Sequence, residues 1–415
     1  MQRHNIFLIL INLDLAGGWS DTPPICYEVG GSVLNVAVQV DNRRPIQCAS
    51  RVIEDPFIIL HSLKKSGDEI NGDTVICKCF KDFLNVSDTS SSTSLLKAAI
   101  LVLRIIEKSD VEYYRNLSDE TENEKFSNRL VAIVGGGLEV ACISDLPAGS
   151  GMGGSSIVAA VVVQSLVDLL CIKTSKNNLI DLVTQVEQVL SSGGGWQDQI
   201  GSIFGGFKIG RSLPKLPLQV SVQELPVHSS LIAAFEKRCF LIYTGKQRLA
   251  KNILINALRN CSLTPACIDQ DKNYNTVSSL IHGAETGCDL LVRQNNNNIA
   301  DDDCIDNLAR IVDEYFQFKV QMAPGTNPDH IQNIINSVLP ISEGNSLCGA
   351  GGGGYACVFL KRGNNKSDLL KTIDDYNTAN KLSLTVHDVT IDIDGIATRK
   401  LDNTLYIDLK DYLLI

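Results

Sequence analysis

The chain has 415 residues, of which 44% are hydrophobic and 20% charged, a composition typical of globular proteins. Its length predicts two or three domains and excludes the collagen-like, disordered and disulfide-stapled classes. Lysine and arginine total 37 against 47 aspartates and glutamates, and the resulting net charge of −10 disfavours general binding to nucleic acid or to an anionic membrane.

The cysteines and histidines indicate a reducing compartment and no zinc site. The 13 cysteines are an odd number, include no Cys-x-x-Cys pair and lie mostly in apolar runs, so we expect free thiols and a cytoplasmic location. The 6 histidines are scattered and form no short-range ligand pair. The longest apolar helix, Ile157–Cys171, is shorter than the ~20 residues of a membrane span, so no such span is predicted.

Hydrophobic periodicity predicts strands and helices in mixed order. The predicted strands are Ile6–Leu15, Ser32–Val40, Pro45–Val52, Leu130–Ile133, Leu138–Cys142, Cys239–Tyr243 and Ala356–Leu360. The predicted helices are Leu95–Lys108, Ser155–Cys171, Asn178–Leu190, Leu249–Leu258, Ile305–Phe318 and His330–Val338. This mixture favours an α+β fold over an all-parallel sheet. The turn-rich segment Gly205–Pro217 is the candidate domain boundary, and Ser87–Ser94, Ser118–Asn128 and Asn295–Asp303 are expected to be surface insertions.

The first motif, Asp14–Pro24, follows the first predicted strand. Its residues predict a tight turn that exposes Trp19, Ser20 and Asp21. An exposed tryptophan ring can stack on a sugar, and a neighbouring carboxylate can accept hydrogen bonds from its hydroxyls. A packed turn explains the same residues equally well.

The second motif, Leu146–Ser156, is a glycine-rich segment between a predicted strand and the long apolar helix. Its glycines allow backbone amides to turn toward a ligand, and the positive end of the helix dipole favours phosphate. The segment lacks the lysine of a Walker A loop and the spacing of the dinucleotide fingerprint. A flexible turn before a helix capped by Ser155 or Ser156 explains the pattern about as well.

The third motif contains two carboxylates, Glu187 at the edge of a helix's apolar stripe and Asp198 after three glycines. A kinase needs two such groups in different surroundings, one to hold Mg²⁺ and one to receive a hydroxyl proton. Taken alone, Glu187 is better explained as a solvated charge and Asp198 as a turn residue. The fourth motif, Cys348–Tyr355, is a glycine run that leads directly into the apolar strand Ala356–Leu360, which predicts close approach to another backbone or to a ligand.

Together and in this order, the four motifs resemble the GHMP kinase superfamily over about Leu13–Phe359. Within that superfamily, the segments that resemble the L-fucokinases are Asp14–Pro24, Asn35–Pro45, Gly193–Gln199 and Tyr243–Ala250. The bacterial heptose-phosphate kinases share the element at Tyr243 but usually have a different first turn. The resemblance implies a two-domain α+β fold, with an N-terminal domain over residues 1–212 that contains a left-handed β-α-β unit and a C-terminal ferredoxin-like domain over residues 213–415.

The resemblance also implies ATP and Mg²⁺ as cofactors and a role for each matching residue. The ATP-phosphate loop would comprise Pro147, Gly149, Ser150, Gly151, Met152, Gly153, Gly154, Ser155 and Ser156. Ser155 and Glu187 would bind Mg²⁺, and Asp198 would be the base toward the sugar hydroxyl. The residues implied to contact the sugar are Trp19, Ser20, Asp21, Gly351 and Gly352.

The implied activity is phosphorylation of L-fucose at the anomeric hydroxyl, which gives fucose 1-phosphate for GDP-fucose salvage. The alternatives are a heptose-phosphate kinase and a sugar- and nucleotide-binding sensor without turnover. Asn12 favours the sensor, because family members usually carry Arg or Lys there, beside the transferring phosphoryl group. The retained Ser155, Glu187 and Asp198 favour an enzyme, whereas Gly154, in place of a usual Thr, is tolerable in a loop.

Eukaryotic fucokinases usually carry a long region similar to a nucleotide-sugar pyrophosphorylase before the kinase part. No such region precedes the first motif in this sequence. We therefore expect residues 1–12 to be the edge of a truncated or wrongly started chain.

Overall fold

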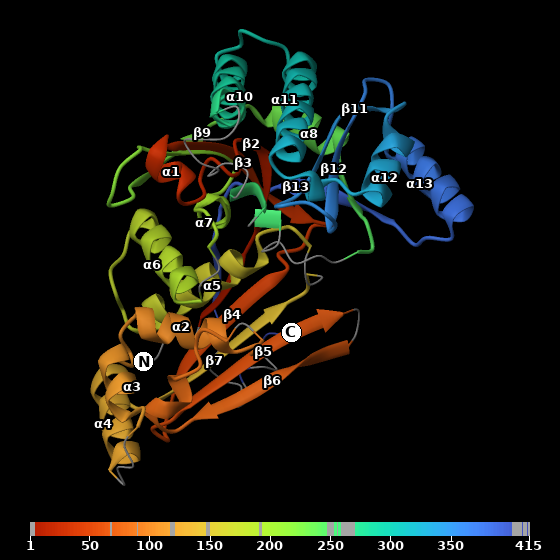
Figure 1. Ribbon diagram of the computed structural model, residues 1–415. Helices are drawn as coiled ribbons and strands as arrows, with labels where there is room; N and C mark the ends of the chain where they lie inside the picture. Colours follow the sequence, from red (N-terminus) through yellow and green to blue (C-terminus); the bar gives the residue numbers. More distant parts are fainter. Residues whose placement is uncertain are drawn as a thin grey trace.

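The computed structural model describes residues 5–66, 69–88, 90–116, 121–146, 150–190, 193–246, 253–254, 256–258 and 270–400, together with 409 and 413. Two β-sheets organise this part of the chain (Figure 1). The first has six strands in the order β14-β1-β4-β7-β5-β6, and only the β5–β7 pair is parallel. Its strands are β1 (Asn5–Ile9), β4 (Ile46–Ile53), β5 (Ile58–Ser66), β6 (Glu69–Cys77), β7 (Gly137–Ser144) and β14 (Ala397–Lys400).

The second sheet has eight strands and joins both halves of the chain. Its order is β11-β12-β10-β13-β3-β8-β9, and β2 also pairs with β3. Its strands are β2 (Ile11–Ala16), β3 (Gly31–Val40), β8 (Phe207–Ser212), β9 (Val220–Leu225), β10 (Cys239–Tyr243), β11 (Ser342–Leu347), β12 (Tyr355–Leu360) and β13 (Thr385–Ile391). The predicted boundary near residue 212 therefore falls between two paired strands of one sheet, and the domain limits stay a prediction.

The helices lie around and between the sheets. They are α1 (Ile25–Glu28), α2 (Ser94–Val102), α3 (Lys108–Tyr114), α4 (Glu122–Val134), α5 (Gly154–Leu169), α6 (Lys176–Val189), α7 (Gln197–Ile203), α8 (Ser229–Arg238), α10 (Gln270–Asn295), α11 (Asp301–Met322), α12 (Asp329–Val338) and α13 (Lys366–Asn380). Figure 1 shows α10 and α11 over β2 and β3 at the top of the molecule, and the six-stranded sheet at the bottom. None of the helices in the described ranges is long and apolar enough to cross a membrane.

Three predicted elements differ from the structure. The strand Ile6–Leu15 is two strands that break at Leu10 and enter different sheets. The predicted strand Leu130–Ile133 lies in helix α4 instead, because Phe126 and Leu130 are buried at helical spacing while Ile133 is exposed.

The helix Leu95–Lys108 is divided into α2 and α3 around Arg104, whose φ of 56° cannot continue a right-handed helix. Of the predicted helix Leu249–Leu258, residues 253–254 and 256–258 are helical and the others lie outside the described residues.

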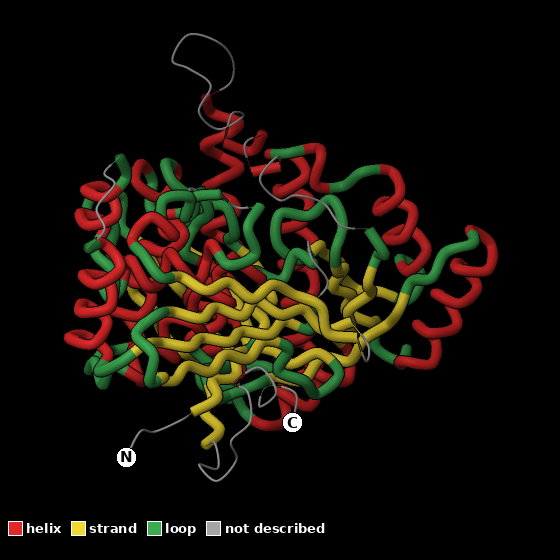
Figure 2. The backbone as a smooth tube through the Cα atoms, turned by 90° about the horizontal axis from the view of Figure 1, so that it is seen from below, coloured by secondary structure: helices red, strands yellow, loops and turns green. Residues whose placement is uncertain are grey.

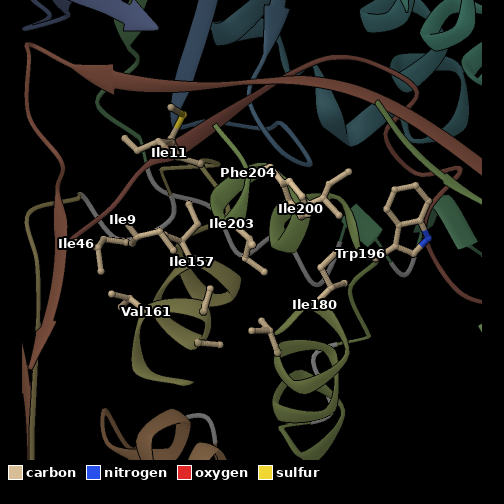
Figure 3. Close-up of a cluster of buried hydrophobic side chains, with 14 of the residues drawn as sticks. Ile9, Ile11, Ile46, Ile157, Val161, Ile180, Trp196, Ile200, Ile203 and Phe204 are labelled. Atoms are coloured by element: carbon tan, nitrogen blue, oxygen red, sulfur yellow. The ribbon is translucent and has the colours of Figure 1, made fainter. Parts of the chain in front are cut away.

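The main core fixes α7 against the start of α5. Helix α5 is apolar on all sides, and its Ile157 and Val161 are fully buried. Figure 3 shows Ile157 between Ile9 of β1 and Ile203 of α7, and Val161 on the side of Ile46. Viewed from below, the strands of the six-stranded sheet lie in front of the helices (Figure 2). A smaller cluster that includes Ile6, Ala49, Ala141, Leu409 and Leu413 is separate from the main core.

Candidate functional site

The glycine-rich loop before α5 packs directly on the second glycine run. Gly151 has a φ of 76°, and a Cβ atom there would lie 2.5 Å from the carbonyl oxygen of Cys348. A Cβ atom at Gly349 would lie 2.4 Å from the carbonyl oxygen of Gly151, and the amide of Tyr355 donates to the carbonyl oxygen of Ser150 at 3.1 Å. The close approach predicted for the glycine run is therefore confirmed, and its partner is this loop.

Other predicted residues of the two glycine runs lie in different surroundings. Pro147 and Gly149 lie outside the described residues, and Met152 is buried. Gly351 and Gly352 pack on Thr326, whose carbonyl oxygen accepts a hydrogen bond from the amide of Gly352 at 2.6 Å.

Asp198 lies in the first turn of α7, against the end of the same loop. A Cβ atom at Gly153 would lie 2.6 Å from both Cγ and Oδ1 of Asp198. Asn12 Nδ2 donates to Asp198 Oδ1 at 3.3 Å, so the residue that the sequence marks as unusual does contact the predicted base. Burial and the neighbouring carboxylates of Asp14 and Glu187 hold the pKa of Asp198 well above its usual range. The ionised form of a carboxyl group with a raised pKa is a stronger base than an ordinary carboxylate.

Glu187 is buried beside α5, so its interpretation as a solvated helix-edge charge is wrong. Its Oε1 accepts a hydrogen bond from Ser156 Oγ at 2.5 Å, and its Oε2 accepts one from Gln199 Nε2 at 2.7 Å. Ser155, the predicted Mg²⁺ ligand, is exposed, and the structure brings Ser156 to Glu187 instead. Burial raises the pKa of Glu187 to about 7 despite these hydrogen bonds.

The pair formed by Ser156 and Glu187 fits Mg²⁺. A hydroxyl and one carboxylate are hard oxygen ligands, and protein Mg²⁺ sites usually combine one or two carboxylates with substrate phosphates and waters. Across the described ranges, no group of three or more His, Cys, Asp or Glu side chains could hold a metal alone. An ion here would need further oxygen ligands, which phosphates at the N-terminus of α5 can supply.

The turn at Trp19, Ser20 and Asp21 is buried, and the prediction that it exposes these side chains is wrong. Their exposed fractions are 5%, 0% and 1%. Ser20 Oγ donates to the carbonyl oxygen of Gly17 at 2.6 Å. Asp21 accepts hydrogen bonds from the amides of Trp19 at 2.9 Å and Gln197 at 3.0 Å. The turn folds inward because its polar groups satisfy buried amides, and Asp21 thereby fixes the start of α7.

Burial raises the pKa of Asp21 to about 6, although the backbone hydrogen bonds oppose this shift. A Cβ atom at Gly195 would lie 1.9 Å from Asp21 Oδ2. A side chain at position 195 would therefore clash with Asp21. The glycine allows the segment before α7 to pack closely against the Asp21 carboxylate.

Sequence reasoning missed two charged residues near Asp198. Asp14 is on β2, and its Oδ1 is buried without a hydrogen-bond partner among the described residues. Burial raises the pKa of Asp14 to about 7, and the charge of Lys319 opposes the rise. Lys319 is fully buried on α11, where burial lowers its pKa to about 8 and Asp14 and Asp198 oppose this shift. No clear signal in the sequence marks Lys319, because a lysine is rarely fully buried and on a helix ordinarily indicates a solvated face.

We expect Glu187→Gln to reduce the amount by which the free energy of unfolding falls as the pH rises from about 4.5 to about 7. The folded protein keeps a proton on Glu187 up to about pH 7, whereas the unfolded chain releases it near the ordinary pKa of 4.5. The parent's free energy of unfolding should therefore fall as the pH rises between these values, by at most about 1.4 kcal/mol per pH unit from this group. Glutamine does not titrate, so the variant should gain stability relative to the parent over this range.

Urea unfolding between about pH 5 and about pH 8 measures this difference. Glu54→Gln changes an exposed glutamate and serves as the control. Parallel pH curves for the parent and Glu187→Gln would mean that Glu187 is already ionised in the folded protein.

Residues 111–206 match the family model "GHMP kinases N terminal domain". The chain is 28% identical over 366 residues to "Bifunctional fucokinase/GDP-fucose pyrophosphorylase" of Arabidopsis thaliana, covering 88% of this chain and 31% of that protein. It is 28% identical over 352 residues to "L-fucokinase/L-fucose-1-P guanylyltransferase" of Bacteroides fragilis, covering 85% of this chain and 34% of that protein. The chain thus spans about a third of the length of these curated relatives.

A solved structure shares the fold over most of the chain. The D-glycero-D-manno-heptose 1-phosphate kinase from Bacteroides thetaiotaomicron superposes with a TM-score of 0.64 at 16% identity. The match covers 96% of this chain and 100% of that one. At this identity, the likeness establishes the fold.

Proposed function

We propose that the chain is an ATP- and Mg²⁺-dependent sugar kinase, because residues 111–206 match the GHMP kinase N-terminal domain and the chain's α+β fold is that of the heptose 1-phosphate kinase described above. The proposed reaction phosphorylates L-fucose at the anomeric hydroxyl to give fucose 1-phosphate. The observation that carries the proposal is the contact between Asp198 and Gly153, which brings the predicted base to the end of the predicted phosphate loop.

The loop before α5 supports the nucleotide role. Helix α5 has 16 residues, and its first amides and positive dipole end face the segment Ser150–Gly153. A Cβ atom at Gly154 would meet nothing within 4 Å, and Ser155 is exposed, so this helix end has space for phosphates. Glu187 and Ser156 would hold the Mg²⁺ bound to those phosphates, with Ser155 as the ligand that the resemblance implies. The ion would neutralise charge on the transferring phosphoryl group.

Asp198 would accept the proton of the sugar hydroxyl as that oxygen attacks the γ-phosphorus. The carboxylate must be ionised to act as this base, and burial, which raises its pKa, makes the ionised form a stronger proton acceptor. Gly153 limits how far Asp198 can move, so the base stays aligned with the phosphate loop.

The buried turn changes the proposal for the sugar contacts. Trp19 has no free ring face, so we do not propose that it stacks on the sugar. Asp21 and Ser20 shape the site by fixing the backbone of the turn and of α7. Asp21 is more deeply buried than Trp19, so it is likewise not proposed as a direct sugar contact, whereas Gly351 and Gly352 remain part of the proposal.

The preference for fucose rests on the two curated relatives, both of which are named as fucokinases. The same names include a second activity that forms or uses a nucleotide sugar, and we propose that this chain's product serves such a step. A heptose-phosphate kinase is the second candidate, because a structure with that name shares the fold over 96% of this chain. We also propose a cytoplasmic location, consistent with the free cysteines of the described ranges.

We expect phosphoryl transfer from ATP to depend on L-fucose, with galactose and heptose phosphates as poor substrates. The measurement is ADP release and sugar-phosphate formation over a panel of free and phosphorylated sugars, with ATP alone as the background. A heptose phosphate turned over as fast as L-fucose would favour the second candidate. Binding of ATP and fucose without product would favour the sensor.

A further inference from the structure

The site carries a neutral side chain where the resemblance implies a cation. Asn12 contacts Asp198, and an amide donor stabilises an anion less than a charged group does. We propose that Lys319, which comes from the other half of the chain, supplies the positive charge that position 12 lacks. The inference rests on the proposed function, because it assigns the charge to the same phosphoryl transfer.

Lys319 is held in a defined position by the second glycine run. Its Nζ donates to the carbonyl oxygen of Leu347 at 2.9 Å and to that of Gly349 at 2.5 Å. The same Nζ lies 4.8 Å from the ring centroid of Tyr315, one turn earlier on α11. An ammonium group has three N–H donors, and the third has no hydrogen-bond partner among the residues that the structure describes.

Backbone contacts connect this ammonium group to the phosphate loop. Gly349, which accepts from Lys319, packs on the carbonyl oxygen of Gly151. Two residues further on, Gly153 packs on Asp198. A single layer of backbone therefore lies between Lys319 and the loop that we assign to the ATP phosphates. Across one layer of backbone in a buried site, the positive charge of Lys319 is screened much less than a charge at the surface would be.

The carboxylates on the facing elements respond to this charge. Lys319 lowers the pKa values of Asp14 on β2 and Asp198 on α7, against the larger effect of burial. Besides these two, Cys348 faces the ammonium group, and Asp21 and Glu187 act on Asp198. Four buried carboxylates lie around the site, and Lys319 offsets part of their effect by favouring the ionised form of Asp198, which is the form that accepts a proton.

Two other cations fit the role less well. Lys208 is also fully buried, but burial holds its pKa well below the usual range, and its Nζ donates to the carbonyl oxygen of Gly206. Arg43 is largely exposed and pairs with Asp145 at 3.8 Å. Lys319 combines full burial with a fixed position beside the glycine run.

Lys319 acts on the reaction indirectly. Its ammonium group holds the glycine run in place, and its charge favours the ionised form of Asp198. We expect Lys319→Met to lower kcat by roughly 10²-fold, the effect of removing one preorganised donor, with the KM for sugar nearly unchanged. The acid limb of the pH profile should move to higher pH, because Asp198 loses a cation that favours its ionised form.

A compensating substitution separates charge from structure. Asn12→Arg alone should raise kcat/KM by less than about 3-fold, because the charge is already present, whereas in Lys319→Met it should restore at least about 10-fold. Lys361→Met is the matched control, since Lys361 Nζ also donates to two carbonyl oxygens, those of Leu339 and Pro340, at 3.0 and 3.1 Å. The control should keep the parent's kcat and pH profile.

Three outcomes would overturn the inference. Lys319→Met could keep kcat within a few-fold of the parent, or lose activity with an unchanged pH profile and no recovery on adding Asn12→Arg. In the third, Asn12→Arg activates an inactive parent, which would mean that the charge is missing. Lys319→Arg, which keeps the charge, is the second variant to be compared if Lys319→Met is unstable.

If neither the parent nor Asn12→Arg phosphorylates any sugar, the proposed function has failed, and the charge role is then tested by unfolding alone. Lys319→Met should lose stability more steeply than the parent as the pH rises from about 5 to about 8, because Asp14 and Asp198 ionise without their cation. Equal slopes would overturn the inference without reference to activity.

Discussion

Asp198→Asn should lower kcat by roughly 10² to 10⁴, the range expected for removal of a general base. The substitution keeps the shape of the side chain and its contact with Gly153, so the KM for ATP should change little. The amide cannot accept the proton of the sugar hydroxyl, which must then leave to water. Steady-state kinetics with ATP and the preferred sugar measures both constants.

A control for this substitution should change a half-buried aspartate outside the site. Asp313 lies on α11, accepts a hydrogen bond from the amide of Asn345 at 3.2 Å and, like Asp198, has a pKa that burial raises. Asp313→Asn should leave kcat unchanged. If Asp198→Asn keeps kcat within a few-fold of the parent, Asp198 is a turn residue and another group takes the proton.

Gly153→Ala should reduce kcat/KM by roughly 10²-fold, because it moves the base. The φ of Gly153 is 70°, which alanine adopts only with strain, and the new Cβ would lie 2.6 Å from Cγ of Asp198. Either the loop or the carboxylate must shift, and the alignment between phosphate and base is lost. The expected signature is a large fall in turnover in a protein that still unfolds cooperatively.

Gly135→Ala controls for the backbone strain alone. Gly135 ends α4 with a φ of 88°, and a Cβ atom there would meet nothing within 4 Å. This control should lose about 1 kcal/mol of stability and no activity. Equal activity of Gly153→Ala and Gly135→Ala would show that the contact with Asp198 does not position the base.

The apolar periodicity of the sequence predicted the bounds of a helix or strand well where that periodicity is strong. Strand β10 has the predicted bounds, and β12, α5, α6 and α12 lie within three residues of theirs, because each has a strong apolar period. Strands β5 and β6 were missed, since β6 is largely exposed and shows no buried alternation. Helix α10 was also missed because its sequence is mostly polar.

The residues of the site likewise divide into those that contiguous motifs predict and those that depend on how distant elements pack. The loop before α5, Glu187 and Asp198 could be found because their motifs are contiguous in the sequence. The burial of Trp19 and Lys319 could not, because it depends on where α10 and α11 pack against β2 and β3. Exposure is a property of the assembled layers, and a lysine on a helix ordinarily indicates a solvated face. The sequence alone therefore could not predict which charged groups lie near Asp198.

The pairing of distant strands has a consequence for how the chain reaches this structure. Strand β1 pairs with β14, and β3 pairs with β13, so an early strand of each sheet finds a partner that is made only after most of the chain has left the ribosome. Such pairings carry a high loop-closure cost and slow the folding of a domain. Until then, β1 and β3 each keep an edge without one of its final partners, and unpaired strand edges promote aggregation. Expression yield should therefore depend on the rate of synthesis and on chaperones more than the stability of the finished fold would suggest.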